Sequence, residues 1–179
     1  MMETHAFAVN QPSRMARDEF VRVFGGVYEH SPWIAETAWE LGPGPETDAA
    51  RDTAEGIHRA FRTVVDEAGR EKQLALLRAH PDLAGKLAIA GELTAASNAE
   101  QAGADLGNCT PDEFEAFGSL NEAYKDKFGF PFILAVRGFH RTEILEIFRE
   151  RVNNDPETEL ATALEQVHRI ALLRLCDIE

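Results

Sequence analysis

Apolar residues recur at helical spacing along almost the whole chain, and this pattern constrains the fold more than any other feature. Such stripes lie over residues 20–28, 50–65, 114–128 and 160–175. Residues three and four apart share one face of a helix, so each stripe marks a face that packs on a core. The pattern predicts an all-α fold, a compact irregular bundle of about seven to nine helices. No repeat or linker interrupts it, so residues 1–179 are expected to form a single domain.

Proline and capping residues predict where several helices begin and end. Ser31-Pro32 is typical of an N-cap followed by proline at the first helical position. Thr47 is expected to cap a long helix that stops at Gly69. Thr110-Pro111-Asp112-Glu113 predicts a capping box, and Asp155-Pro156 is expected to open the last helix.

Two segments do not fit a helix. Residues 41–45 read Leu-Gly-Pro-Gly-Pro and form the clearest loop of the chain. Residues 130–136 are apolar and are expected to form either a short strand or a buried loop. Pro131 argues against a central strand, because proline cannot donate to the ladder of hydrogen bonds.

The charge balance excludes some classes of partner. The chain has 31 acidic and 18 basic residues among 179, which gives a formal net charge of −13. Nucleic acids and anionic membrane surfaces are bound largely through Lys and Arg, so neither is an expected partner. An anionic substrate would have to be held by local donors.

Several sequence features favour a cytoplasmic location. Cys109 and Cys176 lack Cys-x-x-Cys spacing, which predicts free thiols in a reducing compartment. The first residues lack the basic start and apolar run of a signal peptide, and no apolar run is long enough to span a bilayer.

His80 is the strongest candidate for chemistry. Pro81 biases His80 away from the α region, so His80 is expected at a helix break. An imidazole near a carboxylate and an amide suits general acid/base catalysis. On position alone, however, a polar residue at a helix end that bonds a nearby carbonyl is the simpler interpretation.

Downstream, Ser97-x-x-Glu100-Gln101 also has two interpretations. It fits a capping box, in which serine and glutamate satisfy two backbone donors. At a helix N-terminus the same residues would gather a hydroxyl, a carboxylate, an amide and N–H groups suited to a polar or anionic ligand. Arg137 is either one half of an ordinary ion pair or charge support for a buried carboxylate site, and the residues leave that choice open.

No pattern in the chain indicates a metal or a cofactor. The six histidines do not form His-x-His or His-Glu-x-x-His spacing. Neither a phosphate-binding glycine loop nor a Gly-x-Ser-x-Gly elbow occurs. The sequence therefore predicts no metal and no cofactor.

Four motifs together resemble the 2-oxo-4-hydroxy-4-carboxy-5-ureidoimidazoline (OHCU) decarboxylase family, whose members catalyse the last step from urate to allantoin. They span nearly the whole chain and consist of Tyr28–Glu36, Arg78–Leu83, Ser97-x-x-Glu100-Gln101 and Tyr124-x-x-Lys127-Phe128-Gly129-Phe130-Pro131-Phe132-Ile133. One departure is visible: members often have Ala-Gly-Leu soon after the Glu-Gln pair, whereas Ala104-Asp105-Leu106 stands here.

The resemblance implies an all-helical fold, no cofactor, a homodimer and a small-molecule ureidoimidazoline substrate. It implies that His80 is the catalytic acid/base and Glu100 its carboxylate partner. Substrate-binding residues are then expected at Pro81, Ser97, Gln101, Phe132, Ile133, Leu134, Ala135, Val136 and Arg137.

The implied reaction suits these residues. Loss of CO2 leaves electrons that the ring can hold as an enolate, without a metal or an imine. Backbone N–H groups and Gln101 are expected to stabilise charge, His80 to donate the proton, and Glu100 to orient His80 or hold the substrate hydroxyl. A helix begun by Pro81 would disfavour imidazolium, whereas Glu100 would favour it, and the sequence does not decide between them.

Two other functions compete with this one. The first is a non-catalytic all-α interaction module that keeps the fold. The second is a metal-dependent hydrolase of ureides, which a chelator would inhibit.

Overall fold

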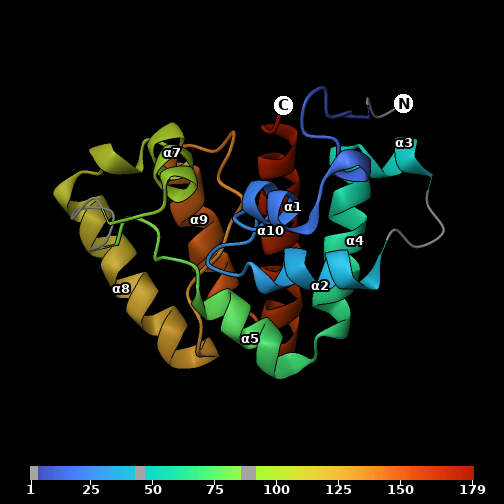
Figure 1. Cartoon of the computed structure of the whole chain (residues 1–179). Helices are drawn as coiled ribbons and strands as arrows, with labels where there is room; N and C mark the ends of the chain where they lie inside the picture. The colour runs from blue at the N-terminus through green and yellow to red at the C-terminus, as the bar shows by residue number, and fades with distance from the viewer. Residues whose placement is uncertain (1–3, 43–46, 86–91) are drawn as a thin grey trace. The chain divides into compact units, whose positions relative to one another are not determined.

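The structure is a computed structural model that describes residues 4–42, 47–85 and 92–179 (Figure 1). These residues form nine α-helices and no strand, with one isolated bridge between Ala6 and Thr53, so the all-α prediction is confirmed. The helices are α1 Arg17–Phe24, α2 Trp33–Leu41, α3 Asp48–Arg51, α4 Ala54–Glu67, α5 Arg70–Arg78, α7 Ala95–Gly103, α8 Pro111–Phe128, α9 Arg141–Arg151 and α10 Pro156–Cys176. Two short 3-10 helices, Pro12–Arg14 and Leu106–Asn108, accompany them.

The contacts divide the chain into two compact units. The first comprises the described residues up to Ala79 together with His168–Glu179, and the second comprises His80–Val167. Helix α10 contributes residues to both units. Among the described residues, no helix has the length and hydropathy needed to cross a bilayer.

The core of the first unit is aromatic. The Phe20 ring centroid lies 5.0 Å from that of Phe24, 5.3 Å from that of Trp39 and 6.1 Å from that of Phe61. These rings come from α1, α2 and α4, which pack against one another. The apolar stripes of the sequence therefore do face this core, although α1 ends at Phe24 and the buried residues Val27 and Tyr28 follow it outside a helix.

Two predicted helix boundaries in this unit are wrong. Helix α2 begins at Trp33, and the Ser31 hydroxyl donates to the Glu29 carbonyl instead of capping the helix. The long helix predicted from Thr47 breaks at Thr53, whose hydroxyl accepts from the Gly56 N–H at 3.0 Å and so starts α4. The predicted loop begins at Gly42, the C-cap of α2, and residues 43–45 lie outside the described residues.

His168 is a buried histidine of the first unit. Its Nδ1 lies 2.8 Å from the Tyr28 hydroxyl, and its Nε2 lies 3.4 Å from Asp66 Oδ1. Burial lowers the pKa of His168, and the Arg62 guanidinium lowers it further, while the Asp66 carboxylate opposes the shift. The folded protein therefore holds His168 neutral under conditions where an unfolded chain would protonate it.

We expect His168 to make stability depend on pH. Because the folded pKa lies below the unfolded value of about 6.5, the unfolded chain binds the extra proton first, and stability falls as the pH drops below about 6.5. Urea unfolding at pH 7.5 and pH 5 measures the loss in the wild type and in His168→Gln, which keeps a polar partner for Tyr28. The wild type should lose more unfolding free energy than the variant. Equal losses would contradict this assignment.

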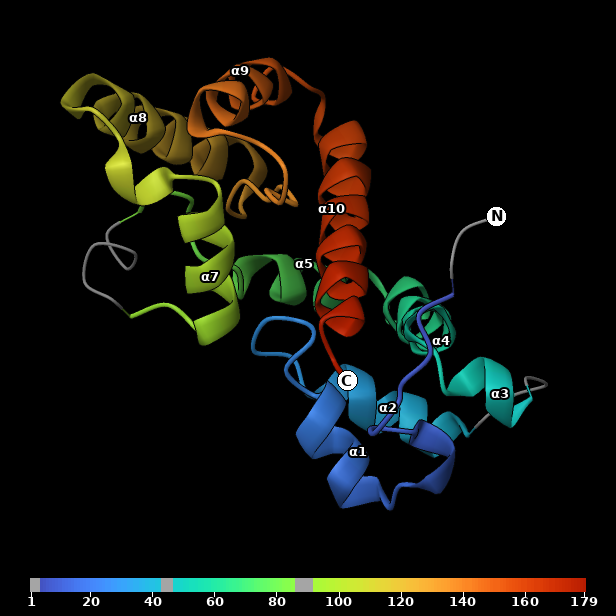
Figure 2. The ribbon, with the colours of Figure 1, turned by 90° about the horizontal axis from the view of Figure 1, so that it is seen from above.

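The second unit holds the irregular segment that follows α8. Helices α8 and α9 pack against each other, and residues 130–140 connect them without regular secondary structure (Figure 2). Phe132 stacks on Phe148 with ring centroids 3.8 Å apart, and Tyr124 meets Phe132 edge-on at 5.5 Å. Of the two alternatives for residues 130–136, the buried loop is therefore confirmed.

Candidate active site

His80 lies just after the end of a helix, as Pro81 predicts. Helix α5 ends at Arg78, and the His80 side chain is buried, with 8% of the residue exposed. The helix expected to begin at Pro81 is absent from the described residues, because Pro81–Gly85 form a turn in which Ala84 has a φ of +48°. The helix end that adjoins His80 in the chain is thus the carboxyl end of α5, which favours a cation.

Side chains from two helices hold the turn after His80. The Gln101 carboxamide accepts from the Ala84 N–H at 3.1 Å and donates to the Asp82 carbonyl at 3.3 Å. From α8, Asn121 donates to the Leu83 carbonyl at 3.0 Å. Buried backbone groups need hydrogen-bond partners, and these three bonds supply them for the Asp82 carbonyl, the Leu83 carbonyl and the Ala84 N–H. Gln101, which was expected to stabilise charge, thus joins α7 to the segment that carries His80.

Ser97 and Glu100 lie inside α7, and the capping-box interpretation is wrong. The N-cap of α7 is Thr94, whose hydroxyl accepts from the Ser97 N–H at 3.2 Å. Ser97 and Gln101 are four residues apart and are both buried, whereas Glu100 is half-buried on the adjoining part of the helix surface. The helix end therefore does not need the Glu100 carboxylate, and the simplest structural explanation for this residue no longer applies.

Five of the residues expected to contact substrate are consecutive in the chain, and all five belong to the core. Phe132 to Val136 are between 0% and 7% exposed. Two side chains bond the backbone of this segment: Arg151 Nη1 donates to the Ile133 carbonyl at 2.7 Å, and Gln166 Oε1 accepts from the Ala135 N–H at 3.1 Å. Sequence analysis missed Arg151 and Gln166, as well as Asn121, because their partners are distant in the chain and no local pattern marks them.

Arg137 differs from the other expected substrate-binding residues. It is exposed, and it precedes Gly138 in a turn closed by a 2.9 Å bond from the Phe139 N–H to the Val136 carbonyl. Gly138 has a φ of +90°, a conformation that favours glycine. An exposed turn gives little support to the role of Arg137 beside a buried carboxylate.

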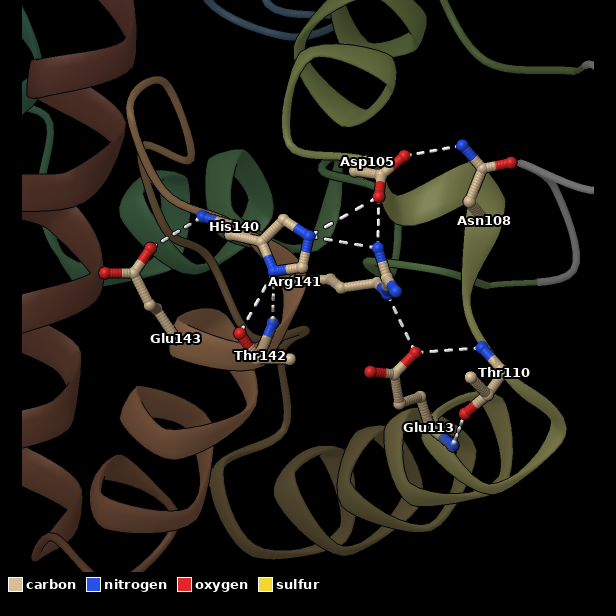
Figure 3. A network of polar contacts seen from close by, with 8 residues as sticks. All are labelled: Asp105, Asn108, Thr110, Glu113, His140, Arg141, Thr142 and Glu143. Carbon is tan, nitrogen blue, oxygen red and sulfur yellow. Dashed lines mark hydrogen bonds and ion pairs between the residues drawn. The ribbon is translucent and has the colours of Figure 1, made fainter.

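The departure from the Ala-Gly-Leu pattern has a local explanation (Figure 3). Asp105 adopts a left-handed conformation with a φ of +60°, which glycine adopts freely and aspartate tolerates better than most residues. Its carboxylate accepts from Asn108 Nδ2 at 2.5 Å and from Arg141, and these partners lower its pKa. Arg141 Nε also donates to Glu113 Oε2 at 2.8 Å. Asp105 thus ends α7 as a glycine would and links it to the first turns of α8 and α9.

The second unit also contains a pocket of about 500 Å³. It touches Gln101 and Ala84, and the other described residues that line it are Leu93, Asn98, Ala102, Leu106, Gly107, Cys109 and Phe114. Phe114, which the stripe over 114–128 had placed in the core, is 41% exposed here. In residues 4–42, 47–85 and 92–179, no group of three or more His, Cys, Asp or Glu side chains is arranged to hold a metal ion.

Comparisons with known proteins agree over nearly the whole chain. The family model described as OHCU decarboxylase matches residues 13–176. A Haloferax volcanii protein named 2-oxo-4-hydroxy-4-carboxy-5-ureidoimidazoline decarboxylase is 43% identical over 173 residues, which are 97% of this chain and 96% of that protein. A Halalkalicoccus jeotgali protein of the same name is 40% identical over 159 residues, which are 89% of this chain and 84% of that protein.

A solved structure shows the same likeness in three dimensions. The crystal structure of (S)-allantoin synthase superimposes with a TM-score of 0.71 at 36% identity. The match covers 91% of this chain and 50% of that one, so this chain spans half the length of that protein.

Proposed function

The chain belongs to the OHCU decarboxylase family, and on that premise we propose that it converts 2-oxo-4-hydroxy-4-carboxy-5-ureidoimidazoline to (S)-allantoin in urate degradation. It acts as a carboxy-lyase that needs no cofactor. The observation that carries the proposal is the 43% identity to the Haloferax volcanii decarboxylase over 97% of this chain. A chemical reason supports the same proposal: His80 is buried, follows the end of a helix and precedes a turn that Gln101 holds.

The reaction requires little more than orientation and one proton. The bond between ring carbon 4 and its carboxylate breaks, CO2 leaves, and the electron pair stays on the ring as an enol-type intermediate. The former 4-hydroxyl becomes a carbonyl, and a proton adds to the ring carbon that bears the ureido group. Counting the carboxylate as ionised, one proton is taken up in each turnover.

We assign the roles as follows. His80 is the acid that delivers the proton, and Glu100 orients His80 or holds the substrate hydroxyl. Ser97 lies about one helical turn from Glu100 on the adjoining part of α7, so its hydroxyl is suited to the same ligand. Pro81, Gln101 and the segment Phe132–Val136 complete the site, and the buried segment helps to exclude water.

Three broader expectations belong to the same proposal. Residues 1–179 act as one functional domain, two copies form a homodimer, and the reaction takes place in the cytoplasm. The rival interaction module predicts no rate increase over buffer with freshly generated substrate. A metal-dependent hydrolase predicts strong inhibition by a chelator that added metal reverses.

We expect Glu100→Gln to reduce turnover without reducing stability. Glutamine and glutamate have similar helix propensities, and Glu100 does not cap α7, so the urea midpoint should stay near wild type. The amide has no charge to orient an imidazolium, so kcat should fall by about 10- to 100-fold, a part of the ~10²–10⁴-fold that acid/base catalysis supplies.

Glu146→Gln is the matched control, because Glu146 is exposed on α9 and is also within a helix. The control should keep wild-type turnover. Full activity in Glu100→Gln would show that the Glu100 carboxylate has no part in the reaction.

A further inference from the structure

A buried ionic network lies behind the proposed substrate segment. Glu159 of α10 is fully buried, and its Oε1 accepts from Arg151 Nε at 2.9 Å and from Arg151 Nη2 at 2.5 Å. The Tyr124 hydroxyl donates to the same oxygen, and Asn154 donates to Oε2 at 2.8 Å. Burial and the Glu159 charge raise the pKa of Tyr124 well above its usual range, so this hydroxyl remains a donor. Every partner of the carboxylate is thus a fixed hydrogen-bond donor.

The network continues into the segment itself. Arg151 is held by Glu159, donates to the Ile133 carbonyl at 2.7 Å and stacks over the Phe132 ring at 4.6 Å. Two residues along, the Ala135 N–H donates to Gln166 at 3.1 Å. A carbonyl and an amide of one short segment are therefore each held by a side chain, one from α9 and one from α10.

We propose that Arg151 and Gln166 are positioning residues, which hold the Phe132–Val136 segment in a fixed position relative to the reacting ring of the substrate. The inference rests on the proposed function, in which this segment lines the substrate. Neither side chain needs to touch the substrate. They act through the backbone between residues 133 and 135, to which each of them is hydrogen-bonded.

Stability alone is a poor explanation for such a network. A buried ion pair loses hydration on both charges, and replacing it with apolar residues is often neutral or stabilising. The Glu159 carboxylate instead fixes the Arg151 guanidinium through two directed bonds, and Arg151 in turn fixes the Ile133 carbonyl through a third. A shift of about 1 Å in groups that hold a substrate can cost about 10²-fold in rate. The position of this segment therefore matters to the reaction as well as to folding.

Gln166 permits a test that does not unfold the protein. Gln166→Ala removes the acceptor for the Ala135 N–H, whereas Gln166→Glu keeps an acceptor oxygen and should rescue it. Gln73→Ala is the matched control, because Gln73 donates to the Val65 carbonyl at 3.1 Å and lies in the first unit. The measurements are kcat, KM, the enantiomer ratio of allantoin formed within minutes, and hydrogen exchange at the Ala135 amide.

We expect Gln166→Ala to lower kcat/KM by about tenfold and to release some (R)-allantoin, with faster exchange of the Ala135 amide. Gln166→Glu and Gln73→Ala should form (S)-allantoin at rates close to wild type. A purely structural role would move the melting temperature without changing the enantiomer ratio.

Two results would overturn the role while leaving the proposed function intact: unchanged exchange at Ala135, or normal kcat/KM with a single enantiomer in Gln166→Ala. A wild-type protein that fails to accelerate decarboxylation would remove the function itself, and this role with it.

Discussion

His80→Ala is expected to lower kcat for decarboxylation by about 10²- to 10⁴-fold while the helical circular dichroism spectrum is retained. Alanine cannot donate a proton, so the variant lacks the proposed acid. The fold should survive, because Gln101 and Asn121 continue to hold the turn after His80 in the variant. Single-turnover kinetics with freshly generated substrate measure the chemical step directly.

The control for this substitution is a second histidine, His140, which lies outside the proposed site at the start of α9. His140 is exposed and caps α9, and asparagine is among the best N-cap residues, so His140→Asn should keep both the helix and the activity. A folded His80→Ala protein that turns over substrate at the wild-type rate would contradict the proposed acid. A comparable loss in His140→Asn would show that the effect of His80→Ala is not specific to the site.

The features predicted correctly from the sequence are those that depend on residues close together in the chain. Helical periodicity indicated the fold class, and the capping box at Thr110 forms as expected, with Glu113 bonding back to the Thr110 N–H at 2.8 Å. The break at Thr53 was missed, because apolar periodicity continues across it. Thr53 ends the preceding turn, and Gly56 lets α4 approach so closely that a Cβ there would lie 1.9 Å from the Ala50 carbonyl oxygen. Packing of this kind leaves no periodic signal.

The candidate site shows the same division between local and distant causes. Pro81 was sufficient to predict that His80 lies at the end of a helix, because proline restricts the backbone conformation of the residue before it. The start of α7 was misplaced because Ser97-x-x-Glu100 matches the capping pattern, whereas Thr94 performs the capping and Ser97 is buried. The bonds of Gln101 to Asp82 and Ala84 cross 19 and 17 residues, and that of Arg151 to Ile133 crosses 18. Such contacts depend on the tertiary structure and cannot be found by local rules.

The second large expected effect concerns the stereochemistry of the product, because the uncatalysed reaction has no means of favouring one enantiomer. The enol-type intermediate is flat at the carbon that takes the proton, so water in free solution reaches both faces and should give racemic allantoin. A single acid held on one side, with the other side closed to water, delivers the proton to one face only. His80 is the proposed acid, and the buried Phe132–Val136 segment is the proposed barrier.

We therefore expect the wild-type protein to form (S)-allantoin alone, and His80→Ala to let the product approach a racemic mixture at a rate near that in buffer. Circular dichroism or chiral chromatography within minutes of mixing measures the enantiomer ratio of the allantoin as it is formed. Racemic product formed no faster than in buffer would refute the catalytic function and favour the interaction module. A single enantiomer formed by His80→Ala at a reduced rate would assign facial selectivity to the Phe132–Val136 segment and its anchors Arg151 and Gln166, because the shape of the site would then exclude one face without help from the acid.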